Sequence, residues 1–261
     1  MKCGIKSIVV IGVGNVGTHL ALLFAEHGIS VTVACRNTSS AKHLSDSGLE
    51  ITSISRIPAD ADLYLLCLKD SVINEIADSL PQINGIVAHT SGSVGIEGLS
   101  RFSKYGVFYP FQTFRKEIAL SNKNFPILIE ASDVETEQIL FNAATELTSF
   151  AYKSNTKERS AIHAAGVFVS NFSNLMYECG WKIAEKNGFD AEKMLRPLID
   201  ETASRLKYMR PLNLQTGPAI RNDVDTMHKH LETLKWNPDL YNLYKELSNI
   251  LLKQYGHEKL S

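Results

Sequence analysis

A glycine pattern close to the N-terminus constrains the fold of this chain more than any other feature. Residues 8–17 (Ile-Val-Val-Ile-Gly-Val-Gly-Asn-Val-Gly) combine a short β-branched run, the spacing Gly-x-Gly-x-x-Gly and the start of a helix. In this context Gly12 permits a tight turn, Gly14 lets the backbone approach a pyrophosphate, and Gly17 lets the helix pack against the strand, while N–H groups at the helix start attract phosphates. The pattern predicts a dinucleotide site, and a tight turn without a ligand is the alternative. The predicted contact residues of this turn are Gly12, Gly14, Asn15, Val16 and Gly17.

The first half of the chain alternates short apolar runs with helix-length segments, which is typical of βαβ units around a parallel sheet. After about residue 154 the strand signals disappear and helical patterns continue to the C-terminus. The sequence therefore predicts an α/β fold, with a Rossmann doubly wound, mainly parallel sheet in residues 1–153 and an all-helical domain in residues 154–261. The predicted strands are Ser7–Ile11, Ser30–Cys35, Leu63–Leu68, Gly85–His89, Gly106–Phe108, Pro126–Glu130 and Phe150–Tyr152.

The end of the second predicted strand indicates which dinucleotide binds. NAD-binding folds usually place an acidic residue there for the ribose hydroxyls, whereas this chain has Arg36, Asn37 and Thr38. An arginine fork with neutral donors suits a 2′-phosphate, so we predict NADP(H) as the cofactor; a solvated surface arginine is the alternative. Leu68 and Lys69 end the strand beside the first one and are predicted to lie next to the cofactor.

Two polar or aromatic loops follow later strands at the same edge of the predicted sheet. Residues 89–93 (His-Thr-Ser-Gly-Ser) offer Ser91 as a candidate catalytic residue and Ser93 as a substrate contact, although an ordinary Ser/Gly turn that caps the next helix explains the same residues.

The second loop, residues 109–114 (Tyr-Pro-Phe-Gln-Thr-Phe), is unusually aromatic for a connection between elements. It could form the wall of a substrate pocket, with Tyr109 and Gln112 as polar contacts. Aromatic packing beneath a domain interface is the alternative.

A long helix is predicted over Lys157–Lys186, and it is apolar on nearly all sides, which predicts that it is buried. On a regular helix His163, Ser170 and Asn174 lie within about 20° of one line, with Asn171 beside it. Buried polar groups need partners, which could be a substrate and nicotinamide, another helix or a second subunit. We interpret His163 and Asn171 as candidate catalytic residues and Ser170 and Asn174 as candidate substrate contacts.

Residues 217–223 (Gly-Pro-Ala-Ile-Arg-Asn-Asp) precede another predicted helix, for which Asp223 is the expected cap. Arg221 could hold a substrate carboxylate or phosphate, and a structural Arg–Asp pair is the alternative. The scattered histidines, including His228 and His230, lack carboxylates at ligand spacing, so we predict no metal site.

The composition argues against several classes of partner. The formal net charge is −1, which gives no field for nucleic acid, and the apolar run Ile8–Val13 is too short to cross a bilayer. The four cysteines form no Cys-x-x-Cys pair, which favours a reduced, cytoplasmic protein. The predicted partners are a small-molecule substrate and, because the apolar helix needs cover, a second copy of the chain in a homodimer formed through the helical domain.

These motifs together resemble the 6-phosphogluconate dehydrogenase-like superfamily, which includes pyrroline-5-carboxylate reductase, prephenate dehydrogenase and the deazaflavin-dependent NADP reductases. They are most similar to two-domain bacterial NADP oxidoreductases whose C-terminal half is a domain of unknown function. The resemblance implies a Rossmann domain, a helical domain that commonly dimerises, and an active site between the two. The segments that carry it are Gly12–Gly17, Arg36–Asn37, His89–Ser93, Tyr109–Phe114, His163–Asn171 and Gly217–Asp223.

The chain also departs from the better-known members of this superfamily. Prephenate dehydrogenases carry a catalytic histidine in a His-Pro element, and the corresponding place in this chain looks like Tyr109–Pro110, which argues against the same mechanism. The Lys-and-Asn helix pair of the hydroxyacid dehydrogenases is replaced by His163 and Asn171.

We therefore expect an NADP(H)-dependent oxidoreductase that transfers a hydride to or from a small carbonyl or imine in an interdomain cleft. His163 is the expected proton donor, since histidine is the side chain that changes charge near neutral pH. A non-catalytic NADP(H)-binding sensor or interaction protein is the alternative, and a lyase that uses the nucleotide structurally is a third interpretation.

Overall fold

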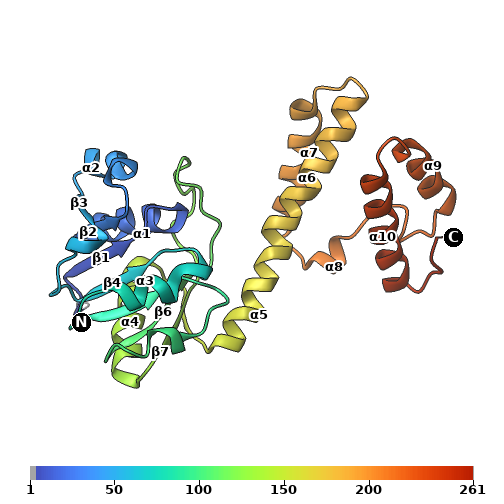
Figure 1. The fold of residues 1–261 in the computed structure, drawn as a ribbon. Helices are drawn as coiled ribbons and strands as arrows, with labels where there is room; N and C mark the ends of the chain where they lie inside the picture. The colour runs from blue at the N-terminus through green and yellow to red at the C-terminus, as the bar shows by residue number, and fades with distance from the viewer. Residues whose placement is uncertain (1–3, 261) are drawn as a thin grey trace. The chain divides into compact units, whose positions relative to one another are not determined.

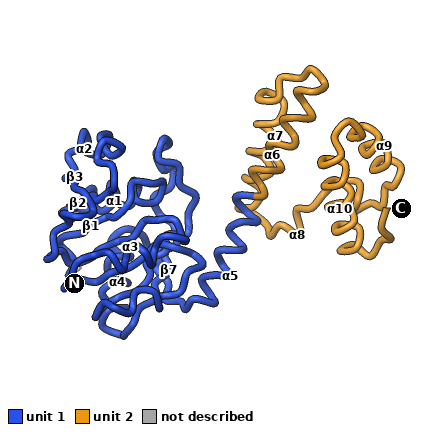
Figure 2. Tube along the Cα trace, in the orientation of Figure 1, with its two compact units in different colours: residues 1–171 blue, residues 172–261 orange. Residues whose placement is uncertain are grey.

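The computed structural model describes residues 4–260 and separates into two compact units, Met1–Asn171 and Phe172–Ser261. Figure 2 shows the two units in different colours. Cys3 lies outside the described residues, and the other three cysteines are free thiols. No helix within residues 4–260 has the length and apolar character needed to cross a membrane.

The first unit is built on one sheet with the strand order β3-β2-β1-β4-β5-β6-β7-β8 (Figure 1). All neighbouring strands run parallel except β6 and β7, which are antiparallel. The connection direction reverses between β1 and β4, which is the switch point where α/β sheets bind ligands. This confirms the predicted fold class. The strands are β1 (Ser7–Ile11), β2 (Ser30–Cys35), β3 (Glu50–Ser53), β4 (Leu63–Leu66), β5 (Ile86–His89), β6 (Tyr105–Pro110), β7 (Ile127–Ala131) and β8 (Ala151–Lys153).

The sheet is covered on both faces because successive side chains of a strand point to opposite sides. Ile8 and Val10 of β1 join the core cluster that includes residues of α1 (Asn15–Glu26) and α4 (Val134–Leu147). Val9 and Ile11 join the opposite cluster, to which α3 (Ile73–Ser79) contributes. Figure 1 shows these helices around the sheet. The remaining short helices of this layer are α2 (Lys42–Asp46) and the 3-10 turns η1 (Thr38–Ala41), η2 (Ile54–Arg56), η3 (Asp70–Val72) and η4 (Ile96–Leu99).

Two local features of this unit are its edge strand β3 and the glycine after α1. The edge strand β3 has no counterpart among the predicted strands, because Glu-Ile-Thr-Ser is short and only half-buried. Gly28, just beyond the end of α1, has a φ of 78°, the left-handed conformation that glycine commonly adopts after a helix.

After β8 the described part of the chain consists of helices and the turns that connect them. Helix α5 (Thr156–Gly166) belongs to the first unit and continues into a π-helical segment, Val167–Phe172. In the second unit α6 packs with α7, and α9 packs with α10 around Met227, Leu231 and Leu252. The predicted domain boundary after residue 153 stays a prediction. The helices of the second unit are α6 (Ser173–Lys186), α7 (Ala191–Arg205), α8 (Pro211–Leu214), α9 (Val224–Leu234) and α10 (Pro238–Gln254).

The predicted burial of the long helix is not found in the single chain. Phe168 and Val169 are 69% and 73% exposed. The helix is apolar on several sides, as its sequence indicates, but one chain leaves much of that surface uncovered.

Candidate functional site

The turn after β1 has the geometry of a dinucleotide-binding turn. Gly12 has a φ of 112°, and a Cβ there would overlap the carbonyl oxygen of Cys67. A Cβ at Gly17 would overlap the carbonyl oxygen of Gly12, so both glycines are required by the fold itself. Gly14 differs, because a Cβ at this position would meet nothing within 4 Å. The space beside Gly14 is therefore open for a ligand.

The first turn of α1 suits an anion. Its N-cap is Gly14, and no side chain caps the helix. N–H groups at such a helix start bind phosphate oxygens favourably. Asn15 and Val16 begin the helix beside this opening, and the residues of the turn fit a pyrophosphate.

The loop after β2 supplies the donors expected for a 2′-phosphate. Arg36 and Thr38 are exposed. The Asn37 side chain holds the turn instead, since its Oδ1 accepts from the backbone N of Ser39 at 3.1 Å and from its hydroxyl at 2.7 Å. Ser40 donates to the Asn37 carbonyl at 2.6 Å. The two serines are additional hydroxyls of this loop that the sequence analysis did not single out.

The end of β4 lies directly beside the glycine turn, as predicted. Leu66 pairs in register with Ile11, the last residue of β1. A Cβ at Gly12 would lie 3.2 Å from Cδ2 of Leu68, and Lys69 is exposed just beyond. Both residues predicted from strand order are therefore at the carboxyl edge of the sheet.

His89, at the end of β5, is a structural histidine. Its side chain is fully buried, its Nε2 donates to the Gly95 carbonyl at 3.2 Å, and its Nδ1 accepts from the backbone N of Ser91. Burial lowers the pKa of His89 to about 4, so the ring is neutral at physiological pH. This single tautomer fixes the shape of the loop that follows.

Ser91 takes part in that loop through its hydroxyl oxygen, which accepts from the backbone N of Ser93 and of Val94, both at 3.1 Å. This geometry corresponds to the turn interpretation that the sequence left open. The Ser93 hydroxyl donates to Oδ2 of Asp70 at 2.7 Å. The 89–93 loop is thus tied to the segment after β4.

Tyr109 and His163 form a hydrogen-bonded polar pair in the first unit. Tyr109 lies near the end of β6, His163 lies on α5, and the phenolic oxygen is 2.8 Å from Nδ1 of the imidazole. Burial raises the pKa of Tyr109 to about 12, so its hydroxyl stays protonated beside Nδ1. Tyr109 is 9% exposed, whereas His163 is exposed. The pair therefore has one buried and one accessible end.

Two glycines give α5 the room to approach this edge of the sheet. A Cβ at Gly92 would lie 2.5 Å from Nδ1 of His163, and a Cβ at Gly166 would lie 2.6 Å from the ring of Phe111. Neither glycine has a positive φ, so both are needed for space rather than for backbone conformation. In the sequence Gly92 was interpreted only as part of a turn.

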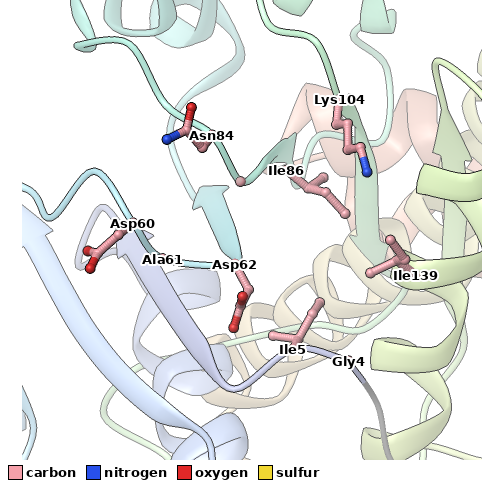
Figure 3. Close-up of a pocket in the computed structure, with 10 residues that line it drawn as sticks. Gly4, Ile5, Asp60, Ala61, Asp62, Asn84, Ile86, Lys104 and Ile139 are labelled. Atoms are coloured by element: carbon pink, nitrogen blue, oxygen red, sulfur yellow. The ribbon is translucent and has the colours of Figure 1, made fainter.

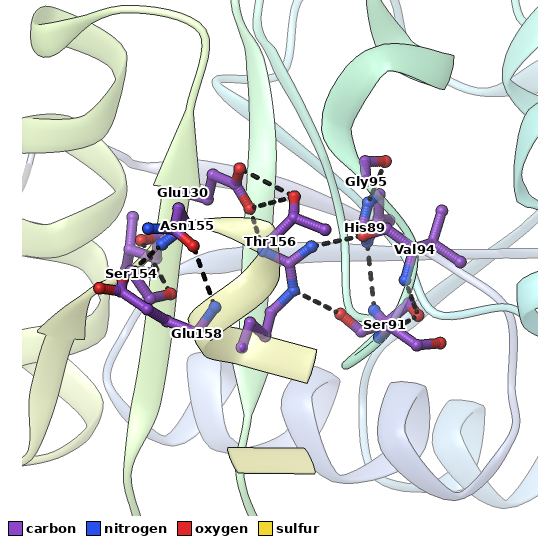
Figure 4. A network of polar contacts seen from close by, with 12 residues as sticks. His89, Ser91, Val94, Gly95, Glu130, Ser154, Asn155, Thr156 and Glu158 are labelled. Atoms are coloured by element: carbon purple, nitrogen blue, oxygen red, sulfur yellow. Dashed lines mark hydrogen bonds and ion pairs between the residues drawn. The ribbon is translucent and has the colours of Figure 1, made fainter. Parts of the chain in front are cut away.

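The start of α5 is fixed by a capping box in which Asn155 accepts from the backbone N of Glu158 at 2.9 Å and Glu158 accepts from that of Asn155 at 3.0 Å. One turn further, the fully buried side chain of Arg159 forms an ion pair with Glu130 of β7 and donates to the Ser91 carbonyl at 3.2 Å. It also donates to the Val94 carbonyl. Figure 4 shows this network. No motif in the sequence predicts this network around Arg159.

The other predicted substrate residues are placed less closely together. Oε1 of Gln112 accepts from the backbone N of Thr113 at 2.7 Å. Ser170 and Asn171 lie in the π-helical segment, where hydrogen bonds run from i to i+5. The predicted line from His163 through Ser170 to Asn174 assumed a regular α-helix, which the chain does not form across residues 167–172.

Two candidates belong to the second unit, namely Asn174 on α6 and the exposed Arg221. Asp223 caps α9 as predicted, accepting from the backbone N of Thr226 at 3.1 Å and from its hydroxyl at 2.8 Å. Within residues 4–260 no three histidine, cysteine or acidic side chains are grouped as metal ligands.

A separate pocket lies at the amino ends of β1, β4 and β5, away from the glycine turn (Figure 3). Its walls include Ile5, Asn84 and Ile86. Asp62, which also lines it, accepts from the backbone N of Lys6 at 2.7 Å and from that of Ser7 at 3.0 Å. The carboxylate joins two strands and is not part of the nucleotide edge.

Comparison with known proteins agrees with this geometry. Residues 7–88 match the family described as NADP oxidoreductase, coenzyme F420-dependent, and residues 125–250 match a domain of unknown function, DUF2520. The crystal structure of the "putative NADP oxidoreductase BF3122" from Bacteroides fragilis is 34% identical, with a TM-score of 0.86 and coverage of 95% of this chain and 98% of that one. No curated protein matches this chain in sequence.

More distant structures share the fold. Protein TM1727 from Thermotoga maritima is 22% identical, with a TM-score of 0.79 over 94% of this chain and 98% of that one. A reductive aminase from Aspergillus terreus, in complex with NADPH4, cyclohexanone and allyl amine, is 17% identical, with a TM-score of 0.71 over 97% and 96%. The resemblance to two-domain NADP oxidoreductases that the motifs indicated is confirmed.

Proposed function

Because this chain belongs to the family of NADP oxidoreductases that join an F420-dependent-type NADP oxidoreductase domain to a DUF2520 domain, we propose that it reduces a small carbonyl or imine with NADPH, or runs the reverse reaction. The observation that carries the proposal is the hydrogen bond of 2.8 Å between Tyr109 and His163. Tyr109 lies near the carboxyl end of β6, at the same edge of the sheet at which β1 ends in the glycine turn. A nucleotide turn and a proton-carrying pair are the two parts that such a reaction needs.

The glycine turn holds the pyrophosphate in this proposal. Gly14 leaves the space for it, and the uncapped start of α1 supplies the donors. Arg36 and Thr38 recognise the 2′-phosphate, while Leu68 and Lys69 border the nucleotide from β4. When bound, the nicotinamide supplies or accepts the hydride.

The protein supplies the proton that accompanies the hydride. In this proposal the Tyr109 hydroxyl donates to Nδ1, and the His163 ring carries the transferable proton on Nε2. His163 gives this proton to the substrate oxygen or nitrogen while the Tyr109 proton moves to Nδ1. A proton from solvent then returns to Nε2 of the exposed imidazole as the Nδ1 proton goes back to the buried phenol, which restores the pair.

A neutral imine that takes up this proton becomes a cation, and the cation would find a suitable environment beside this pair. The carboxylate of Asp70 is held by Ser93 in the adjoining loop, and its charge contributes to the raised pKa of Tyr109. The reductive aminase among the structural neighbours is complexed with a ketone and an amine. Both observations favour an imine over a simple ketone as the first substrate to test.

The remaining candidate site residues were predicted from the sequence and stay predictions. Gln112, Ser170, Asn171, Asn174 and Arg221 are substrate contacts to be tested by substitution. A homodimer through the helical unit is supported by exposed apolar side chains of α6 and α7, such as Leu175, Met194 and Leu198, which are 47%, 58% and 63% exposed. A single-chain mass in light scattering would contradict the dimer.

The central test replaces His163 by Gln and Tyr109 by Phe. NADPH oxidation is followed with a panel of ketones, preformed imines and ketone–amine mixtures, and NADPH affinity is measured by calorimetry. We expect turnover to fall about 100-fold in H163Q, with unchanged NADPH affinity, because general acid catalysis typically contributes this much. If the unmodified protein binds NADPH tightly but oxidises it with no member of the panel, the non-catalytic sensor becomes the better interpretation.

A further inference from the structure

We propose that Arg159 is a positioning residue for the Tyr109–His163 pair, holding α5 against the 89–95 loop so that the imidazole meets the phenol. The inference rests on the proposed catalytic role of that pair. No sequence motif indicates this role of Arg159, which has the most deeply buried charged side chain among the described residues.

The burial of Arg159 requires an explanation. Its side chain is 0% exposed, and a buried guanidinium is unfavourable unless its donors and its charge are fully matched. Glu130 supplies the opposite charge, and the carbonyls of Ser91 and Val94 accept from Nε and Nη2. Thr156 completes the arrangement by donating to both carboxylate oxygens of Glu130 at 3.0 Å.

These partners come from three segments that are far apart in the chain. Glu130 is on β7, Arg159 is on α5, and the two carbonyls belong to the loop after β5. Figure 4 shows Glu130 and Thr156 on one side of the network and Ser91 and Val94 on the other. The guanidinium therefore joins the helix to the sheet and to the loop at once.

The geometry links this anchor directly to the reactive pair. His163 is four residues after Arg159, which is about one helical turn, so the two side chains lie on the same face of α5. The residues that Arg159 binds, Ser91 and Val94, flank Gly92, against which the imidazole packs. Arg159 thus joins one turn of α5 to the loop by hydrogen bonds, and His163 on the next turn packs against the same loop.

Arg159 also acts on Tyr109 through its charge. Burial raises the pKa of the phenol, and the guanidinium partly opposes this increase. The same charge that holds the helix in place thus favours release of the phenolic proton toward Nδ1 of His163.

The test uses the full-length protein with the substitution Arg159→Met and reads out His163 without relying on turnover. Long-range proton–nitrogen NMR of nitrogen-labelled histidine rings reports which ring nitrogen carries the proton. We expect the unmodified protein to show His163 with its proton on Nε2, and both R159M and Y109F to shift the signals toward a mixture of the two tautomers. R159K retains the charge but has fewer donors, so an intermediate shift is expected.

Arg101→Met is the matched control. Arg101 lies in the same unit and donates to the carbonyls of Ala77 and Asp78, both at 2.7 Å, at the end of α3. It binds backbone carbonyls as Arg159 does, but it does not touch the loop or the helix of the pair. R101M should leave the His163 signals unchanged.

The kinetic readout separates positioning from general damage. In R159M we expect kcat to fall about 100-fold, the effect of a misplacement near 1 Å, while the NADPH dissociation constant changes less than about twofold. Unchanged His163 signals in R159M would overturn the proposal, and if R159M does not fold, unchanged signals in R159K would do so. If the signals change as expected but H163Q keeps full turnover, Arg159 positions the pair and the proposed function is wrong.

Discussion

The glycine turn and the Tyr109–His163 pair lie at the same edge of one sheet but are built in opposite ways. The turn is made of backbone atoms, with steric contacts among Gly12, Gly17 and the Cys67 carbonyl. The pair is made of side chains whose positions depend on α5 and on a buried ion pair. The glycine turn is therefore held by close steric contacts between backbone atoms. The position of the Tyr109–His163 pair depends instead on a few contacts between residues far apart in the chain.

The largest effect on stability should come from the substitution Gly12→Ala in the glycine turn. The new Cβ would overlap the Cys67 carbonyl at a φ of 112°, so strain and overpacking should destabilise the protein by about 4 kcal/mol. Urea unfolding measures this change. Gly14→Ala is the matched control, because it meets open space and should lower NADPH affinity while the free energy of unfolding stays nearly constant.

The free energy of unfolding should depend on pH through His89, which fixes the loop beside the Tyr109–His163 pair. Its pKa is about 4 in the folded protein, against an ordinary value of 6.5 for histidine, so the unfolded chain takes up protons first as the pH falls. The stability present above pH 6.5 should decrease by about 3 kcal/mol toward pH 4. Urea unfolding at several pH values checks this, and H89N should remove the slope in that window. Since Asp62 and Asp133 have pKa values lowered from 3.8, their contribution is lost only at lower pH.

A smaller and more selective effect is expected for Gly92→Ala. The added methyl group would displace the imidazole of His163, so turnover should fall about 10-fold to 100-fold without loss of NADPH affinity. Gly95→Ala in the same loop is the control, because its Cβ would meet only the flexible end of Glu97. Equal turnover in both variants would show that the position of His163 does not limit the reaction.

The smallest effect should come from the edge of the nucleotide site. Replacing Arg36 by Ala removes an exposed charged donor, which should weaken NADPH binding about 10-fold and leave NADH binding unchanged. Parallel calorimetric titrations with the two nucleotides measure the difference. An equal loss for both would mean that Arg36 does not recognise the 2′-phosphate.

The parts of the molecule that the sequence predicted are those encoded by neighbouring residues. The glycine turn, the strands of the parallel sheet and the Asp223 cap each depend on a few consecutive positions, and strand order alone placed Leu68 beside the turn. The resemblance to NADP oxidoreductases rested on the same local motifs and is confirmed.

The contacts that the sequence could not predict join residues far apart in the chain. Arg159 meets Glu130 across 29 positions and Ser91 across 68, and nothing near Arg159 in sequence indicates that it is buried. The π-helical segment was also unpredictable from spacing, because an i to i+5 pattern needs only one additional residue in an otherwise helical sequence. Tyr109 and His163 were each identified, but the hydrogen bond between them was not predicted.

The contact between Gly92 and His163 has an evolutionary consequence. The imidazole occupies the volume that any side chain at position 92 would need. The two positions therefore cannot change independently, since a larger residue at 92 is compatible only with a smaller or displaced residue at 163. Among relatives that keep this arrangement, the pair should vary jointly or not at all, so the history of one position constrains the other.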